Sequence, residues 1–259
     1  MDRDALHIAF KSALEWWDVA GVETPPIPPA PKRKTSPPKA AMARKTPLQQ
    51  APAKPPTPKP APKVESAPIA AAAKTLEQLK AAIDTFDAGP LSDNARQAVF
   101  SRGNPEADIM VIGEAPGRDE DIQGKPFVGQ SGQFLDKIFA SIGLSEDTLY
   151  ITNVVNWRPP KNRNPTAEDI EMCLPFIHRH IALIKPKYIC VVGSIAMKAL
   201  TPHSSITRSR GQWVDITVER TTIPALIIFH PAYVLRQPNL KRETWRDMLS
   251  LKGKINAAD

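Results

Sequence analysis

Four short runs of β-branched and other apolar residues alternate with helical patterns in the later part of this 259-residue chain, and this alternation limits the possible folds most strongly. The four runs are 109–112, 149–152, 188–192 and 226–229. Apolar residues recur at helical spacing over 134–142, 170–184 and 244–251. Strands that alternate with helices of this length are typical of βαβ units. The sequence therefore predicts one α/β domain over 75–259, with a four-stranded, mostly parallel sheet flanked by helices.

The start of the second predicted helix carries a capping signal. Thr166 precedes the apolar pattern, and Asp169 follows three residues later. This is the spacing of a capping box, in which each side chain bonds the other residue's backbone N–H. We expect the helix to begin just after Thr166.

The first 24 residues form a segment of their own. Apolar side chains recur at helical spacing over residues 4–20, among them Leu6, Phe10, Leu14 and Trp17. The segment 1–24 is therefore predicted to hold a short amphipathic helix. Such a helix buries its apolar face either on the protein's own surface or on a protein partner, and both interpretations stay open.

Residues 25–74 differ sharply from the rest in composition. They hold 15 of the 28 prolines, ten Lys and Arg residues and a single acidic residue, Glu65. This segment accounts for the net charge of +7, so the remainder is close to neutral and does not bind nucleic acid through bulk charge alone. A Pro/Ala/Lys-rich stretch without periodicity is predicted to be a disordered basic linker that also holds DNA loosely.

Several classes of protein are excluded by what the sequence lacks. Two cysteines, Cys173 and Cys190, rule out a disulfide framework and a four-thiolate metal site. Both lie in apolar patterns and are interpreted as core residues. No run of about 18 apolar residues exists for a membrane span, and the first residues do not form a secretory signal. We expect a cytoplasmic, nucleoid-associated protein.

Polar residues follow the predicted strands at one edge of the sheet. The first strand is followed by Gly113-Glu114-Ala115-Pro116-Gly117, the second by Asn153, the third by Gly193-Ser194 and the fourth by His230-Pro231. In open parallel sheets, ligands bind beyond the carboxyl ends of the strands. The turn at 113–117 matches no dinucleotide or Walker pattern. We therefore predict a binding site at this edge, with Glu114, Glu120 and His230 as its titratable groups.

Three segments resemble, in order and spacing, the signatures of the family 4 uracil-DNA glycosylases. They are Gly113-Glu-Ala-Pro-Gly117 with Gly124-Lys-Pro-Phe-Val-Gly129, then Tyr150-Ile-Thr-Asn-Val-Val155 with Arg158-Pro-Pro-Lys-Asn-Arg163, and finally His230-Pro-Ala-Tyr-Val-Leu-Arg236. The resemblance covers residues 85–250. It implies a uracil-DNA glycosylase-like fold.

The resemblance also implies roles for individual residues. Phe127 stacks on a flipped uracil beside Gly113 and Ala115, Asn153 bonds the Watson–Crick edge of the base, and His230 donates a hydrogen bond to uracil O2. Glu114 and Glu120 position water and crowd the side of the base where thymine carries its methyl group; we favour Glu120 for the water. The DNA contacts implied in this way are Arg158, Asn162, Arg163, Tyr233, Leu235 and Arg236.

The implied activity is that of a monofunctional glycosylase. It hydrolyses the N-glycosidic bond of deoxyuridine in DNA and so begins base-excision repair, without a Schiff-base lysine. Its partner is uracil-containing DNA, and the chain is expected to act as a monomer. The alternatives are a lesion-binding protein that flips the base without turnover, and a scaffold built on the N-terminal helix and linker.

One departure from the family concerns its usual four-cysteine iron–sulfur cluster. No cysteine precedes Cys173 here, so only Cys173 matches a ligand position. Residues 87–91 occupy the place of the first cysteine pair and Trp157 that of the third ligand. Because four thiolates hold such clusters, we expect no iron–sulfur cluster, no other metal and no cofactor. Trp157 and Pro90 are predicted to fill the space.

Overall fold

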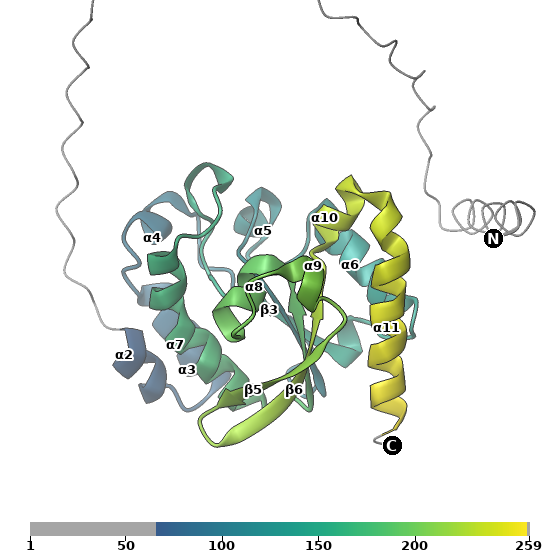
Figure 1. Cartoon of the computed structure of the whole chain (residues 1–259). Coiled ribbons are helices and arrows are strands. Elements are labelled where there is room, and N and C mark those ends of the chain that lie inside the picture. Colours follow the sequence, from purple (N-terminus) through teal and green to yellow (C-terminus); the bar gives the residue numbers. More distant parts are fainter. Residues whose placement is uncertain (1–65, 258–259) are drawn as a thin grey trace, which may run out of the picture. The chain divides into compact units, whose positions relative to one another are not determined.

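The computed structural model describes residues 66–257. A six-stranded mixed sheet lies at the centre of this region, with helices on both of its faces (Figure 1). Its strands are β1 (Arg102–Gly103), β2 (Ile109–Gly113), β3 (Leu149–Asn153), β4 (Tyr188–Val192), β5 (Trp213–Val218) and β6 (Thr221–Ile228). They lie in the order β1-β3-β2-β4-β6-β5.

The four central strands confirm the predicted parallel sheet. β3, β2, β4 and β6 run parallel to one another, whereas β1 and β5 are antiparallel to their neighbours. These two edge strands were not predicted. β1 has only two residues, and β5 alternates buried with exposed positions instead of forming an apolar run. The sheet therefore has six strands instead of four.

The helices cover the sheet in two groups. On one side α2 (Ser66–Ala72) and α3 (Leu76–Thr85) contact α7 (Ala167–Ile184); on the other, α6 (Gln130–Ala140) contacts α11 (Lys241–Asn256). Shorter segments complete the fold: α4 (Pro90–Asn94), α5 (Arg118–Gln123), η1 (Glu146–Thr148), η2 (Pro160–Asn162), α8 (Gly193–Leu200), α9 (Ile206–Ser209), α10 (Pro231–Arg236) and η3 (Pro238–Leu240).

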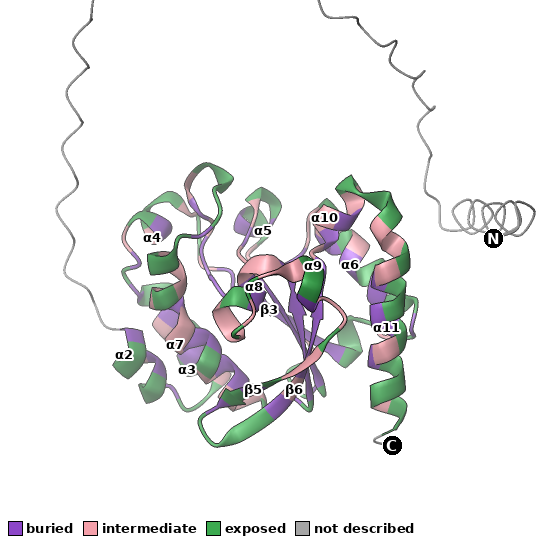
Figure 2. Cartoon of the chain, in the orientation of Figure 1, coloured by how far each residue is buried: buried purple, intermediate pink, exposed green. Residues whose placement is uncertain are grey.

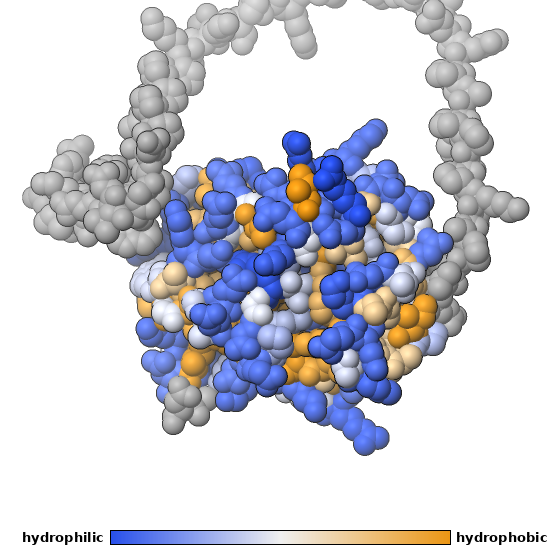
Figure 3. Space-filling view, turned by 180° about the vertical axis from the view of Figure 1, so that it is seen from behind, coloured by the Kyte–Doolittle hydropathy of each residue, from blue (hydrophilic) through white to orange (hydrophobic). Residues whose placement is uncertain are grey.

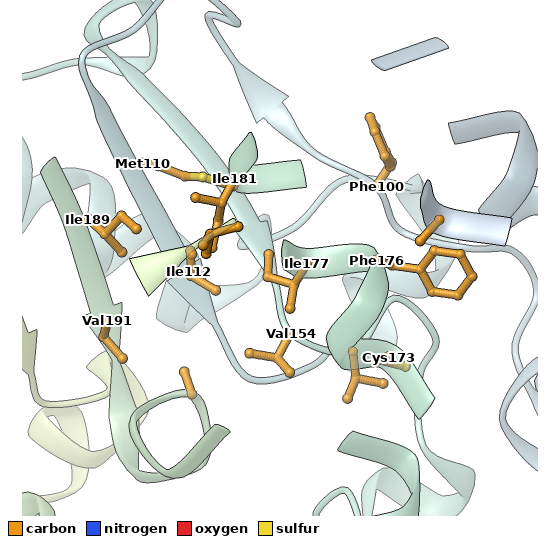
Figure 4. Close-up of a cluster of buried hydrophobic side chains, with 14 of the residues drawn as sticks. Phe100, Met110, Ile112, Val154, Cys173, Phe176, Ile177, Ile181, Ile189 and Val191 are labelled. Atoms are coloured by element: carbon orange, nitrogen blue, oxygen red, sulfur yellow. The ribbon is translucent and has the colours of Figure 1, made fainter. Parts of the chain in front are cut away.

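Two hydrophobic cores result from the two faces of the sheet. Successive side chains of a strand point to opposite faces, so Met110 and Ile112 pack toward α7 while Ile109 and Val111 pack toward α6 and α11. Figure 4 shows the first core. β2, β3 and β4 are buried along their whole length and the outer helix faces are exposed (Figure 2). Burial on both faces explains why these strands read as continuous apolar runs.

The predicted helix starts are confirmed in part. Thr166 caps α7: its hydroxyl accepts from the Asp169 N–H at 3.2 Å, and the Asp169 carboxylate accepts from the Thr166 N–H at 2.8 Å. The helix predicted over 134–142 begins earlier, at Gln130, and the one predicted over 244–251 extends from Lys241 to Asn256. Both extensions consist mainly of polar residues, which carry no apolar periodicity.

The end of the predicted linker was assigned wrongly. Residues 66–72 form α2, and Ala70 and Ala73 are buried in the core beside α7. Alanine is both a good helix former and small enough for close packing, so a segment whose only large apolar residue is Ile69 still folds. The folded region thus begins by Ser66 instead of residue 75. The N-terminal helix and residues 25–65 lie outside the described residues.

The rear surface of the folded region is mostly hydrophilic. Figure 3 shows hydrophobic residues in separate groups on this face, divided by hydrophilic ones. Large hydrophobic side chains exposed in the described region include Ile122, Trp245 and Leu249. No helix between residues 66 and 257 combines the length and the apolar character that crossing a bilayer requires.

Candidate functional site

A pocket of about 720 Å³ lies at the carboxyl edge of the parallel strands. Its walls come from the turns after β2, β3, β4 and β6, the edge at which ligands bind in open parallel sheets. Ten predicted site residues line it: Glu114, Ala115, Glu120, Phe127, Asn153, Asn162, Arg163, His230, Tyr233 and Arg236. Residues that were not predicted, among them Ser131, Asn164, Ser194, Ile206 and Phe229, complete the walls.

Phe127 forms an aromatic wall in an unusual backbone conformation. Its side chain is 6% exposed, and its φ of 54° lies in the left-handed region that residues other than glycine rarely adopt. Its ring lies 5.9 Å from the His230 ring, at an interplanar angle of 28°. Strained residues of this kind cluster at ligand sites, where surrounding contacts hold them in place.

Gly113 lies directly behind Phe127 and Asn153 and does not itself line the pocket. A Cβ atom on Gly113 would overlap the Phe127 ring and lie 2.5 Å from Asn153 Oδ1. Only glycine therefore allows these two side chains to converge. Gly113 therefore leaves the space that the two side chains occupy, and its role in base binding stays a prediction.

Asn153 ends β3 with its side chain facing the pocket. The residue is 3% exposed, and no hydrogen bond joins its side-chain amide to another residue of the described region. A carboxamide offers one acceptor and two donors in one plane. That set is free for a planar ligand that presents a donor beside an acceptor.

His230 follows β6 and caps α10 with its imidazole. Nδ1 accepts a hydrogen bond from the Ala232 N–H at 3.2 Å, so the ring proton of the neutral form resides on Nε2. Burial, followed by the nearby Arg236 charge, lowers the pKa of His230 to about 4. Near neutral pH the ring is thus an uncharged donor. Gly193, at φ 89°, permits the close approach of its backbone to the histidine.

Glu114 follows β2, and its carboxyl group has no partner within the described region. No hydrogen bond or ion pair joins that group to another described residue, although it lines the pocket. Burial raises its pKa above the ordinary value for a glutamate. A carboxylate in such surroundings is a stronger base than one in water.

Glu120 has its carboxylate engaged by the backbone. Oε2 accepts from the Gly117 N–H at 3.1 Å, and Oε1 accepts from the N–H groups of Val128 at 3.0 Å and Gly129 at 2.9 Å. Its side chain therefore closes the loop that connects α5 to α6. Glu120 also lines the pocket, and its water-positioning role stays a prediction.

The residues predicted to contact DNA divide into two groups. Asn162, Arg163, Tyr233 and Arg236 line the pocket, whereas Leu235 lines an adjoining cavity of about 290 Å³ beside Arg118 and Arg236. Arg158 lines neither.

The Arg158 side chain is engaged within its own loop. Its Nε donates to Asn162 Oδ1 at 2.6 Å, and Nη1 lies 3.5 Å from Asp121 Oδ2. These contacts brace the 158–163 loop.

Trp157, at the position that the resemblance assigns to the third cluster ligand, is buried among apolar side chains. We call Phe86, Trp157 and Phe176 the aromatic cluster; the Phe86 ring lies 6.1 Å from Trp157 and 5.0 Å from Phe176. Cys173 is fully buried near it among apolar side chains (Figure 4), and burial raises its pKa to about 12. A lone protonated thiol does not fit a four-thiolate cluster.

Pro90 does not fill this space as predicted. It is exposed and begins α4, where its fixed φ suits the first helical turn. Ala88 and Leu91, on either side of it, are buried in the core instead. Within residues 66–257, no group of three His, Cys, Asp or Glu residues is placed to hold a metal ion.

The fold and the site define an α/β protein with a pocket at the carboxyl edge of its parallel strands. A family model for the uracil DNA glycosylase superfamily matches residues 100–249. The chain is 35% identical over 183 residues to a type-4 uracil-DNA glycosylase of Pyrobaculum aerophilum, covering 69% of this chain and 93% of the relative. The chain therefore belongs to the uracil-DNA glycosylase superfamily.

Two further relatives agree with this assignment. A type-4 uracil-DNA glycosylase of Thermotoga maritima is 34% identical over 184 residues, which cover 70% of this chain and 94% of that protein. A type-4 uracil-DNA glycosylase of Archaeoglobus fulgidus is 40% identical over 146 residues, with 54% and 73% covered. The resemblance inferred from three short signatures is thus confirmed over residues 100–249.

Proposed function

We propose that the chain is a monofunctional uracil-DNA glycosylase that hydrolyses the N-glycosidic bond of a deoxyuridine flipped out of DNA, the first step of base-excision repair. One observation carries the proposal: Phe127, Asn153, Glu114 and a neutral His230 converge on one pocket. Membership of the superfamily supports the same activity.

The base is held between stacking and hydrogen bonding. Extruding a nucleotide costs a few kcal/mol, and stacking on Phe127 recovers about 1–3 kcal/mol. The free amide of Asn153 pairs with uracil N3–H and O4, a donor beside an acceptor. Cytosine presents a different pattern there and leaves the buried amide unsatisfied, which disfavours its binding.

The leaving group is stabilised by His230. As the C1′–N1 bond breaks, its electron pair moves into the uracil ring and negative charge develops on O2. The Nε2–H of the neutral imidazole donates to this oxygen. A fixed donor of this kind is worth about 2.7–4 kcal/mol in the transition state. The low pKa of His230 keeps that proton on the ring without a positive charge.

Water is activated by Glu114 in this mechanism. A water molecule adds to C1′ and gives its proton to the Glu114 carboxylate, while the uracil anion takes a proton from solvent. Glu114 is favoured because its carboxyl group has no other described partner, whereas both oxygens of Glu120 already accept from backbone N–H groups. A Glu114→Gln variant is expected to lose far more activity than Glu120→Asp.

DNA is held along the rim of the pocket. Arg163, Asn162 and Arg236 contact the strand that carries the flipped base, and Tyr233 with Leu235 occupies the space that the base leaves. Arg158 acts indirectly, through the loop it braces. Phosphate contacts of this kind position the duplex and weaken with salt.

The test is a cleavage assay on matched oligonucleotides with uracil or thymine at one position, followed by alkali to break abasic sites. The wild-type protein should cleave only the uracil strand, and His230→Ala should be slower by about 10²–10³-fold. His178→Ala, at an exposed position on α7 outside the pocket, is the matched control. Tight binding without release of uracil would replace this proposal with the lesion-binding alternative.

The cluster is proposed to be replaced by packing. The support for this is that Trp157 stands at the position the resemblance implies for the third ligand and Leu91 lies in the segment implied for the first pair, and both are buried. The Phe86 ring contacts those of Trp157 and Phe176. The purified protein should be colourless and free of iron. An analysis that finds about four irons per chain would contradict this statement.

A further inference from the structure

We propose that Arg102, outside the three signatures and outside the pocket lining, is a positioning residue that holds the backbone of Phe127 and thereby sets the affinity of the pocket for uracil. The inference rests on the proposed role of Phe127 as the stacking surface. Arg102 lies in the short edge strand β1, and its residue is 8% exposed.

The guanidinium of Arg102 bonds the loop on which Phe127 lies. Nε donates to the Pro126 carbonyl at 2.9 Å, and Nη2 donates to the Phe127 carbonyl at 3.3 Å. Two carbonyls in succession are thus fixed from one planar group. A lysine carries its donors on a single nitrogen and lacks this fork.

Two carboxylates orient the same guanidinium. Nη2 lies 2.5 Å from Asp136 Oδ1 on α6, and Nη1 lies 3.3 Å from Glu146 Oε2 in η1. Because both acids are half-exposed, the buried positive charge is neutralised without a second buried charge. The arginine therefore has a fixed direction, which is what a positioning group needs.

Phe127 requires such support because its backbone conformation is unfavourable for a bulky residue. The following residues are held by Glu120 through the N–H groups of Val128 and Gly129. Arg102 holds the preceding side through the carbonyls of Pro126 and Phe127. If the Arg102 contacts are removed, the strained residue is free to relax and its ring turns away from the base.

The chain offers a matched control. Arg179 on α7 makes the same type of bridge: Nε donates to the Ala73 carbonyl at 2.8 Å and Nη1 lies 3.0 Å from Glu219 Oε1. It lies outside the residues that line the pocket. Arg102→Met and Arg179→Met both remove a bridging guanidinium, but only the first acts on Phe127.

The experiment measures inhibition by free uracil together with kcat and KM on uracil-containing DNA. The inhibition constant does not depend on how much of the enzyme is folded, so it separates positioning from general stability. For Arg102→Met we expect this constant to rise by about five- to tenfold, with a lower kcat. KM for DNA should stay within about twofold, since the rim contacts are kept. The uracil inhibition constant of Arg102→Lys should lie between those of the wild type and Arg102→Met. Arg179→Met should leave this constant unchanged.

A Phe127→Ala variant distinguishes the possible failures. It should raise the uracil inhibition constant by about tenfold or more. If Phe127→Ala does so while Arg102→Met and Arg102→Lys both keep the wild-type constant, Arg102 is merely structural and the inference is wrong. If Phe127→Ala has no effect either, the stacking role fails and the inference fails with it.

Discussion

The pocket and the aromatic cluster both lie beside the parallel sheet, but they differ in the kind of side chain that they contain. The pocket contains a strained phenylalanine, together with an asparagine amide and a carboxyl group that have no partner among residues 66–257. The aromatic cluster contains apolar rings at ordinary contact distances around a buried thiol. Polar groups and strain are retained where the proposed chemistry is performed, whereas the aromatic cluster is packed as ordinary core.

The largest effect is expected in the aromatic cluster and concerns stability. Trp157→Ala removes a buried ring and should lower the free energy of unfolding by about 3–5 kcal/mol. Urea denaturation measures this loss. Trp245→Ala is the control, since that side chain is 44% exposed and its removal should cost less than about 0.5 kcal/mol. The folded fraction of Trp157→Ala should keep its activity. A lower kcat in that fraction would show that the aromatic cluster influences the geometry of the pocket.

The next effect is expected at the pocket and concerns activity. Gly113→Ala places a Cβ atom against Phe127 and Asn153, so kcat/KM should fall by about 100-fold. The control is Gly253→Ala in α11, where a Cβ atom meets nothing within 4 Å. Nearly full activity in Gly113→Ala would mean that the two side chains need not converge.

A third effect concerns stability as a function of pH. The pKa of His230 is lowered to about 4 in the folded protein, below the ordinary value of 6.5. Between these values the unfolded chain binds the proton and the folded chain does not, so stability is present above pH 6.5 and is lost as pH falls toward 4. Wild type should lose about 1–2 kcal/mol more than His230→Ala between pH 7 and pH 5. Equal losses would show that His230 titrates normally.

The smallest effect concerns DNA binding. Arg236→Gln should weaken binding evenly across sequences and reduce the slope of log K against log salt by about 0.9, the contribution of one phosphate contact. Arg220→Gln, near the amino end of β6 at the opposite edge, should leave the slope unchanged. Equal slopes for the two variants would show that Arg236 makes no contact with a DNA phosphate.

The sequence was most informative where a local pattern determines structure. Apolar runs identified the four parallel strands, and Thr166 with Asp169 marked the start of α7 because capping depends on neighbouring residues alone. The turns that follow the strands predicted the pocket, since parallel strands bring their carboxyl ends to one edge. Ser194 belongs to such a turn and lines the pocket, so the same signal extends to it.

Features that depend on distant contacts were not predictable. Glu120 lines the pocket as the sequence predicted, but its bonds to backbone N–H groups eight and nine residues away could not be read from the sequence. Arg102 bonds carbonyls 24 and 25 residues later, from a strand too short to give a pattern. The helix α2 looked like linker because its small residues pack against α7, which lies about a hundred residues further along the chain.

The cap that His230 forms on α10 has a consequence for repeated turnover. Its Nδ1 is occupied by the Ala232 N–H and its Nε2 keeps the only ring proton, so the ring neither gains nor gives up a proton in the proposed reaction. The histidine is in the same state after each cleavage as before it. The proton that each excision leaves behind lies on Glu114 alone, so resetting the site for the next excision requires only that this carboxyl group lose its proton to solvent.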